Sequence, residues 1–213
     1  MPGHRNAKKR SKGHHEPSVR YLRYELDNSG TPGNEVSHFV DLAKDLSALN
    51  RRLYRQGKYY YVKKITCQSR NTDNPPAGAS ISVSTCPDSW VSQKAWQRGF
   101  RTWTQMNKEA KGQTSGIMQG TWADFKVYLS DDMRTGSVLE PKDNGGNNPS
   151  TTNAEWIYAK LVTSEGTTTD DEFFLHMLGD HEGNSGVRTS VGLIKSYGES
   201  RATVQIESPD TPG

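Results

Sequence analysis

Residues 155–178 read EWIYAKLVTSEGTTTDDEFFLHML, and this stretch decides the predicted fold. Its two ends, 155–163 and 172–178, are rich in the aromatic and β-branched residues that favour strands. The polar residues between them are rich in Thr and Asp, as in a loop. Six further segments look extended in the same way: 18–26, 58–69, 79–85, 122–130, 189–197 and 202–208. The sequence therefore predicts about eight strands.

Two helices are predicted among the early strands. A short amphipathic helix is expected within 41–56, ending near Gly57, because leucines recur at steps of four, three and four: Leu42, Leu46, Leu49 and Leu53. Pro87 and Asp88 suit the first turn of a second helix. Its apolar stripe continues to Gly112 and consists of Val91, Ala95, Trp96, Gly99, Phe100, Trp103 and Met106. Aromatic residues at this spacing fit either a core or a contact between subunits.

These elements predict an all-β fold, an antiparallel sandwich or barrel with one or two inserted helices, because strands and helices do not alternate as in βαβ units. We expect a disordered basic arm at 1–17, one folded domain at 18–208 and a C-terminal tail at 209–213. An apolar content of 31% and a mean hydropathy of −0.87 suit short strands with polar loops. The sequence has neither a bilayer-spanning apolar run nor a signal-peptide pattern, so we expect a soluble protein made in the cytosol.

The positive charge is concentrated toward the N-terminus. Residues 1–130 hold 21 basic and 10 acidic side chains, and residues 131–213 hold 6 and 14. Five cations lie within eight residues of the arm: Arg5, Lys8, Lys9, Arg10 and Lys12. Each can displace a counterion from a phosphate backbone, so the arm is predicted to bind nucleic acid without reading its sequence. A solubilising tail or a nuclear-import signal, which KKRSK at 8–12 resembles, is the alternative.

A second basic run lies within 51–70, where seven cations and no acidic residue occur. Arg51, Arg52 and Arg55 are the predicted binding residues of this run, and the tyrosines at 59–61 are available for stacking on bases. The run would then continue the track that begins in the arm. A solvated helix face followed by a strand edge is the alternative interpretation.

No catalytic residue, metal or cofactor is predicted. The sequence has no nucleophile elbow, phosphate-binding loop or zinc-protease helix in the required context. Tyr59 and Tyr60 stand four residues before Lys63 and Lys64, as in rolling-circle endonucleases, but the adjacent histidines at 14–15 lie in the arm. His176, Asp180, His181 and Glu182 form the densest set of metal-ligand types; a polar turn is expected there, with a structural calcium as the alternative. The two cysteines, Cys67 and Cys86, are expected to be reduced.

Three segments carry a family resemblance: SVSTCPDSWVSQKAWQRGFRTW (82–103), RTGSVLEPKDNGG (134–146) and TSVGLIKSYGESRATVQ (189–205). In them the chain resembles the capsid (coat) proteins of circular single-stranded DNA viruses that encode a replication initiator, including marine and diatom-associated lineages. The resemblance covers most of residues 35–207. It implies a single eight-stranded jelly roll, self-assembly into an icosahedral shell, and an inward-facing arm that packages the genome. It also implies a chain shorter than its relatives, residing in the virion and passing through the host nucleus during assembly.

We therefore expect a non-enzymatic structural protein whose partners are copies of itself and single-stranded DNA. The first alternative is a monomeric β-barrel that binds single-stranded nucleic acid, with residues 59–64 as a stacking platform. The second is a replication endonuclease that uses Tyr59 or Tyr60 as its nucleophile.

Overall fold

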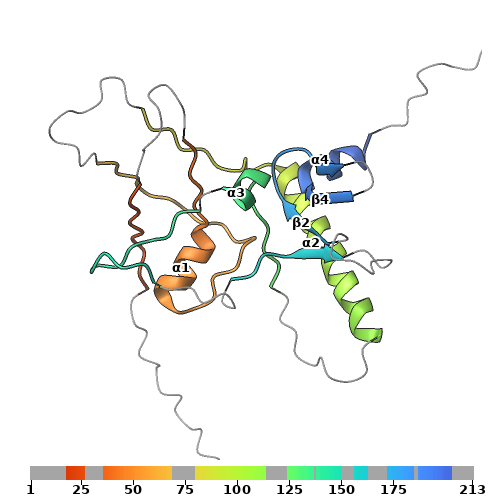
Figure 1. Ribbon diagram of the computed structural model, residues 1–213, viewed down its shortest axis with the longest axis horizontal. Coiled ribbons are helices and arrows are strands. Elements are labelled where there is room, and N and C mark those ends of the chain that lie inside the picture. Colours follow the sequence, from red (N-terminus) through yellow and green to blue (C-terminus); the bar gives the residue numbers. More distant parts are fainter. Residues whose placement is uncertain are drawn as a thin grey trace, which may run out of the picture.

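The structure is a computed structural model of the 213-residue chain, and it describes residues 18–26, 36–68, 80–113, 124–136, 138–149, 156–162, 172–184 and 187–202. Its helices are α1 (Leu42–Asn50), α2 (Trp90–Gln113), α3 (Asp131–Thr135) and α4 (Leu193–Glu199). Its strands are β1 (Lys160–Val162), β2 (Glu172–His176), β3 (Glu182–Asn184) and β4 (Val187–Gly192). In Figure 1, α2, α4 and the sheet gather on one side, α1 and long extended segments lie on the other, and α3 stands between them.

The four strands form one mixed sheet in the order β1-β2-β4-β3. β1 runs antiparallel to β2, with Lys160 opposite Phe174. β2 runs parallel to β4, with Phe174 opposite Ser190, and β3 is antiparallel to β4. The segment before α3 extends this sheet without forming a strand, since Tyr128 donates its N–H to Leu175 O (3.0 Å) and accepts one from Met177 (3.0 Å).

The hydrophobic core lies between α2, α4 and the sheet. Its buried members are Ala95, Phe125, Val127, Ala159, Leu161, Leu175, Met177 and Leu193. Gly99 of α2 lets the helix approach α4 closely, because a Cβ there would lie 2.9 Å from the Leu193 side chain. Burial of the larger side chains among them (Phe, Val, Leu and Met) contributes about 1.5–3 kcal/mol each, so this side of the molecule contributes a large share of the hydrophobic stabilisation.

A polar network joins α1 to the rest of the molecule. Asp41 caps α1 by accepting N–H donors from Ala43 (3.1 Å) and Lys44 (3.2 Å). Its other oxygen accepts hydrogen bonds from Tyr158 Oη (3.0 Å) and Gln56 Nε2 (2.9 Å). α1 is therefore fixed to the lead-in of β1 and to the turn that follows the helix through one buried carboxylate.

The expected all-β jelly roll is wrong. Among the described residues the chain forms four helices and a small four-stranded mixed sheet. The predicted strands at 18–26, 58–69 and 79–85 form no strand where they are described, and all side chains of 61–68 and 80–85 are exposed. A β-rich composition forms a stable strand only where one face is buried and the backbone has a ladder partner. Within the described part of the chain, residues 61–68 and 80–85 have neither, and residues 18–26 have no ladder partner.

Two further predicted strands are only partly right. The segment 189–197 is a strand only up to Gly192; Leu193, Ile194 and Tyr197 then follow helical spacing in α4. In 122–130 the side chains of Phe125, Lys126 and Val127 are all buried, so the alternation of a half-buried strand is absent. The arm at 1–17, the predicted strand from 203 onward and the tail at 209–213 lie outside the described residues.

The two predicted helices are present. α1 is shorter than the expected 41–56, because it ends at Asn50, and it buries Ala43, Asp45 and Ala48 more deeply than its leucines. α2 begins at Trp90 and continues to Gln113, close to the expected bounds. No helix among the described residues is long and apolar enough to span a bilayer.

Candidate nucleic-acid interface

The candidate interface begins where α1 ends. Arg51 adopts a left-handed backbone conformation (φ 49°, ψ 36°), and its N–H donates to Ser47 O. The chain thereby leaves the helix axis and enters a turn. Arg51, Arg52 and Arg55 all lie in this turn and are exposed, so the structure brings together the three folded residues of the predicted site.

Three uncharged residues hold this turn to the body. Ser47 Oγ donates to Ala43 O (2.6 Å) and accepts the N–H of Tyr54 (2.8 Å). Gln56 donates to Asp41, and its Oε1 accepts the N–H of Val127 (2.7 Å). Gly57 (φ 77°) lies against Trp96 of α2, since an added Cβ would stand 2.6 Å from the indole ring. The polar and small residues therefore fix the backbone, and the arginines are left facing solvent.

Three cations of this region have no acidic partner among the residues that the structure describes. Arg52, Arg55 and Lys58 are exposed and form no ion pair with any other described residue. The sequence between 46 and 68 contains six cations and no acidic residue. Such a surface attracts polyanions because each contact with a phosphate releases a condensed counterion. We call residues 51–64 the basic track.

An extended segment carries the track away from the body. Tyr59 stands at the start of this segment, and its hydroxyl oxygen accepts a hydrogen bond from Gln93 Nε2 of α2 (2.8 Å). Tyr59 nevertheless remains 80% exposed. Tyr61 is 93% exposed, and Lys63 and Lys64 are exposed as well. Aromatic faces beside cations are the usual combination for single strands, where bases stack and phosphates pair.

Tyr60, one of the two tyrosines of the endonuclease hypothesis, is poorly activated. Tyr60 Oη donates to Arg55 O (2.7 Å), and partial burial, aided by Asp41 and Tyr54, raises the pKa of the Tyr60 hydroxyl. A nucleophilic tyrosine needs the opposite shift or an adjacent base. The hydroxyl of Tyr60 is therefore a structural donor that steadies the arginine turn.

The histidine-rich turn separates the side chains that the calcium alternative would bring together. His176 is buried, with Nδ1 2.7 Å from Leu178 O, whereas His181 contacts Glu199 (3.1 Å) and accepts the N–H of Gly192 (3.2 Å). Asp180 pairs with Lys195 instead (3.3 Å). Across the described part of the chain, no group of three or more such side chains is placed to hold a metal ion.

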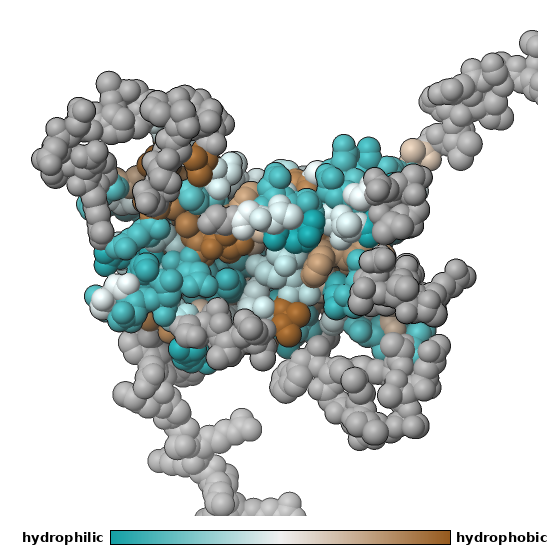
Figure 2. All heavy atoms as spheres, viewed as in Figure 1, coloured by the Kyte–Doolittle hydropathy of each residue, from teal (hydrophilic) through white to brown (hydrophobic). Residues whose placement is uncertain are grey.

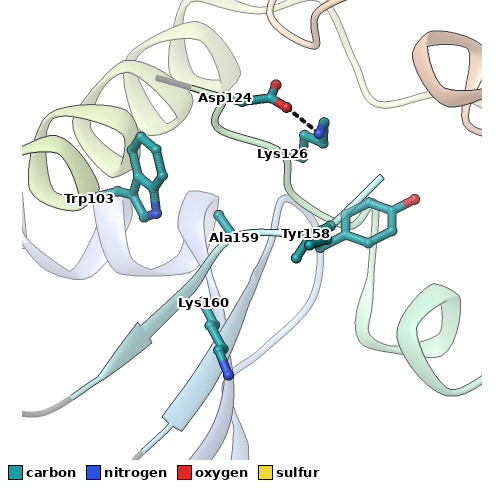
Figure 3. A pocket seen from close by; sticks show the side chains of 7 residues that line it. Trp103, Asp124, Lys126, Tyr158, Ala159 and Lys160 are labelled. Atoms are coloured by element: carbon teal, nitrogen blue, oxygen red, sulfur yellow. Dashed lines mark hydrogen bonds and ion pairs between the residues drawn. The ribbon is translucent and has the colours of Figure 1, made fainter. Parts of the chain in front are cut away.

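A shallow hollow of about 310 Å³ lies near the core, beside the lead-in to β1. Figure 3 shows Trp103 of α2 on one side, with Ala159, Lys160 and the Asp124–Lys126 ion pair around it. Lys126 is buried, and its ammonium also lies 4.3 Å from the centre of the Trp156 ring. Because this cation is already paired and packed, the hollow offers a ligand little free charge.

Sequence reasoning missed the buried acids of α1. Asp45 is fully buried and accepts a hydrogen bond from Tyr24 Oη (2.5 Å). Asp41 is the N-cap and was recognisable from its place before the leucine pattern. Asp45, four residues later, had no signal beyond standing on the same helical face. The five arm cations of the predicted site, Arg5, Lys8, Lys9, Arg10 and Lys12, lie outside the described residues.

Comparisons of this chain with protein-family models, with curated proteins and with solved structures found no match.

Proposed function

We propose that this protein is a coat protein that binds single-stranded DNA through its basic arm and basic track and assembles with copies of itself into a closed shell. The observation that carries the proposal is the basic track: six cations in a sequence that has no acidic residue between 46 and 68, with Arg52 and Arg55 exposed on a fixed turn and two exposed tyrosines after it. Phosphate contacts would supply affinity, and stacking would supply tolerance of any base sequence.

The arrangement of the track supports a strand-following interaction. The turn is held by Ser47, Gln56 and Gly57, so Arg52 and Arg55 lose little backbone entropy when they bind. The extended segment after it advances by about 3.3 Å per residue and its side chains alternate between two faces, so Lys58 and Lys64 follow one face and Lys63 lies on the other. A line of separate cations suits a flexible polyanion better than a compact ligand.

Exposed apolar residues support the self-assembly part of the proposal. Large apolar side chains lie on the surface of the described segments, including Tyr21, Ile65, Ile81, Val83 and Trp90. Figure 2 shows hydrophobic residues exposed among hydrophilic ones on the side that carries α1 and the extended segments. Apolar residues that gather on a surface mark contacts with other molecules, and a coat protein has most of its contacts with identical copies.

The test uses the full chain and a matched pair of charge variants. The first variant carries Arg52→Gln, Arg55→Gln and Lys58→Gln in the track, and the control carries Lys94→Gln, Arg101→Gln and Lys108→Gln on the exposed face of α2. Both lose three cations, so a difference between them reports position and not net charge. We expect the track variant to assemble with less single-stranded DNA and the control to match wild type.

Electron microscopy and the ultraviolet absorbance ratio of purified particles measure assembly and nucleic-acid content separately. Equal DNA content in both variants would remove the track from the binding surface. Protein that stays monomeric across salt and pH, with or without DNA, would contradict the shell and leave the monomeric nucleic-acid-binding protein as the better description.

A further inference from the structure

Residues 80–84, Ser-Ile-Ser-Val-Ser, form an exposed segment with no partner in the described part of the chain. Ile81 is 65% exposed and Val83 is 62% exposed. No backbone hydrogen bond joins this segment to another described residue. Its composition favours a strand. A segment whose N–H and C=O groups have no backbone partner among the described residues offers a template for pairing with another chain.

The absence of charge distinguishes this segment from the basic track. No charged residue occurs between Asp73 and Asp88, whereas the track holds six cations. Nucleic acid therefore has little reason to bind residues 80–84, because phosphate contacts supply most of such affinity. An uncharged segment of alternating polar and apolar residues suits another strand.

The order of the residues favours the same segment of a second copy as that strand, because Ser-Ile-Ser-Val-Ser has nearly the same pattern in both directions. When two copies pair antiparallel about Ser82, Ile81 stands opposite Val83 of the partner subunit, and Ser80 stands opposite Ser84 of the partner subunit. Both apolar residues then share one face, since side chains alternate along a strand. Directly opposite Cβ atoms lie about 4.5–5.5 Å apart, so each Ile contacts a Val.

We propose that residues 80–84 pair antiparallel with residues 80–84 of a second copy about a two-fold axis through Ser82. The contact is isologous, as in most homo-oligomers. It rests on the self-assembly in the proposed function and names one contact of the shell. Five residues a side bury far less than the roughly 800 Å² per partner of a stable interface, so the contact acts together with others in an assembly.

Cysteine cross-linking tests the register. In a background of Cys67→Ser and Cys86→Ser, which removes both native thiols, we compare Ser80→Cys, Ser82→Cys and Ser84→Cys under mild oxidation. Ser82→Cys should give a disulfide-linked dimer, because residue 82 faces itself within the Cα separation that a disulfide spans. Ser80→Cys and Ser84→Cys are equally exposed but stand about 14 Å from their own copies, too far to bridge. Equal cross-linking at all three positions would overturn the pairing.

Charged residues introduced at positions 81 and 83 of the Ser82→Cys protein test whether Ile81 lies opposite Val83 of the partner subunit. Ile81→Lys with Val83→Lys places like charges opposite each other twice, and cross-linking should slow by at least about tenfold. Ile81→Lys with Val83→Glu places opposite charges there and should cross-link much faster than the first variant. Equal rates in the two variants would overturn the register.

Electron microscopy of the same samples separates this inference from the proposed function. Particles without the Ser82→Cys cross-link would overturn the pairing and leave the coat function standing. The cross-link in protein that forms no particles would support the pairing and contradict the shell.

Discussion

Asp45 is a buried carboxyl group whose oxygens receive unequal support. Oδ2 accepts the Tyr24 hydroxyl at 2.5 Å, whereas Oδ1 has no hydrogen-bond partner among the described residues. The pKa of Asp45 is raised to about 7, mainly by burial, and the negative charges of Asp41 and Glu140 contribute to the increase. The Tyr24 hydrogen bond and the positive charge of Lys44 lower the pKa and offset part of this increase. Tyr24 belongs to residues 18–26, so this acid fixes that segment to α1.

The raised pKa of Asp45 predicts a pH-dependent stability. An Asp in the unfolded chain has a pKa of about 3.9, so the protonated form favours the folded state. The contribution is fully present below about pH 4 and is lost as the pH rises through about 7. Asp45→Asn cannot ionise, and we expect it to be more stable than wild type at pH 8 by about 2–4 kcal/mol.

Urea unfolding at pH 5 and pH 8 measures this effect. The Asp45→Asn protein should lose less stability between the two values than wild type. Asp132→Asn, on the exposed surface of α3, serves as the control and should keep the wild-type profile. An unchanged profile in Asp45→Asn would show that the buried carboxyl does not titrate in this range.

At the scale of elements, sequence patterns succeeded where a segment has a single buried face. The apolar stripe of α2 predicted a helix because Trp96, Phe100 and Trp103 return to one side at steps of four and three residues. The segment 58–68 was misjudged because its β-branched and aromatic residues signal strand propensity without specifying a partner. A ladder depends on residues elsewhere in the chain, which propensity does not contain.

The charged residues of the candidate site could be predicted from the sequence, but the residues that hold its backbone in place could not. Arg51, Arg52 and Arg55 follow from composition alone, since a run of cations without acids is visible in the sequence. Gln56 and Gly57, which hold the turn, carry no sequence signal that separates them from ordinary loop residues. Their roles come from contacts with Val127 and Trp96, residues far along the chain.

Gly57 lies where the turn at residues 51–57 packs against α2, and this contact leads to a prediction. Gly57→Ala places a Cβ 2.6 Å from the Trp96 ring on a backbone with φ 77°, so strain and overpacking add. We expect a loss of about 2–4 kcal/mol of unfolding free energy. Gly146→Ala is the control, because its φ of 80° is similar and its added Cβ meets nothing within 4 Å.

Thermal or urea unfolding of both glycine variants separates the two contributions. Gly146→Ala should lose only the strain of a left-handed residue, about 1 kcal/mol. If Gly57→Ala lost no more than that, the turn would not be packed on Trp96, and the arginines would not stand on a fixed support.

At the scale of the whole molecule, the charge is divided between regions with different roles. The basic track follows α1, and the acidic excess belongs to residues 131–213. Several of the described acids in that region are already paired, as Asp131 is with Arg134 (2.8 Å) and Glu172 with Lys160 (2.6 Å). Paired charges contribute little to long-range attraction, so the track is the described surface best suited to polyanions.

The division predicts how salt weakens binding to single-stranded DNA. Each phosphate contact adds about −0.7 to the slope of log affinity against log salt concentration. Deleting residues 1–15 removes five cations and should make the slope shallower by about 3.5, and Arg52→Gln, Arg55→Gln and Lys58→Gln together should do so by about 2. Fluorescence titration of a labelled oligonucleotide across salt concentrations measures both. The two changes should add in the combined variant, because arm and track contact different phosphates; a track variant with the wild-type slope would confine binding to the arm.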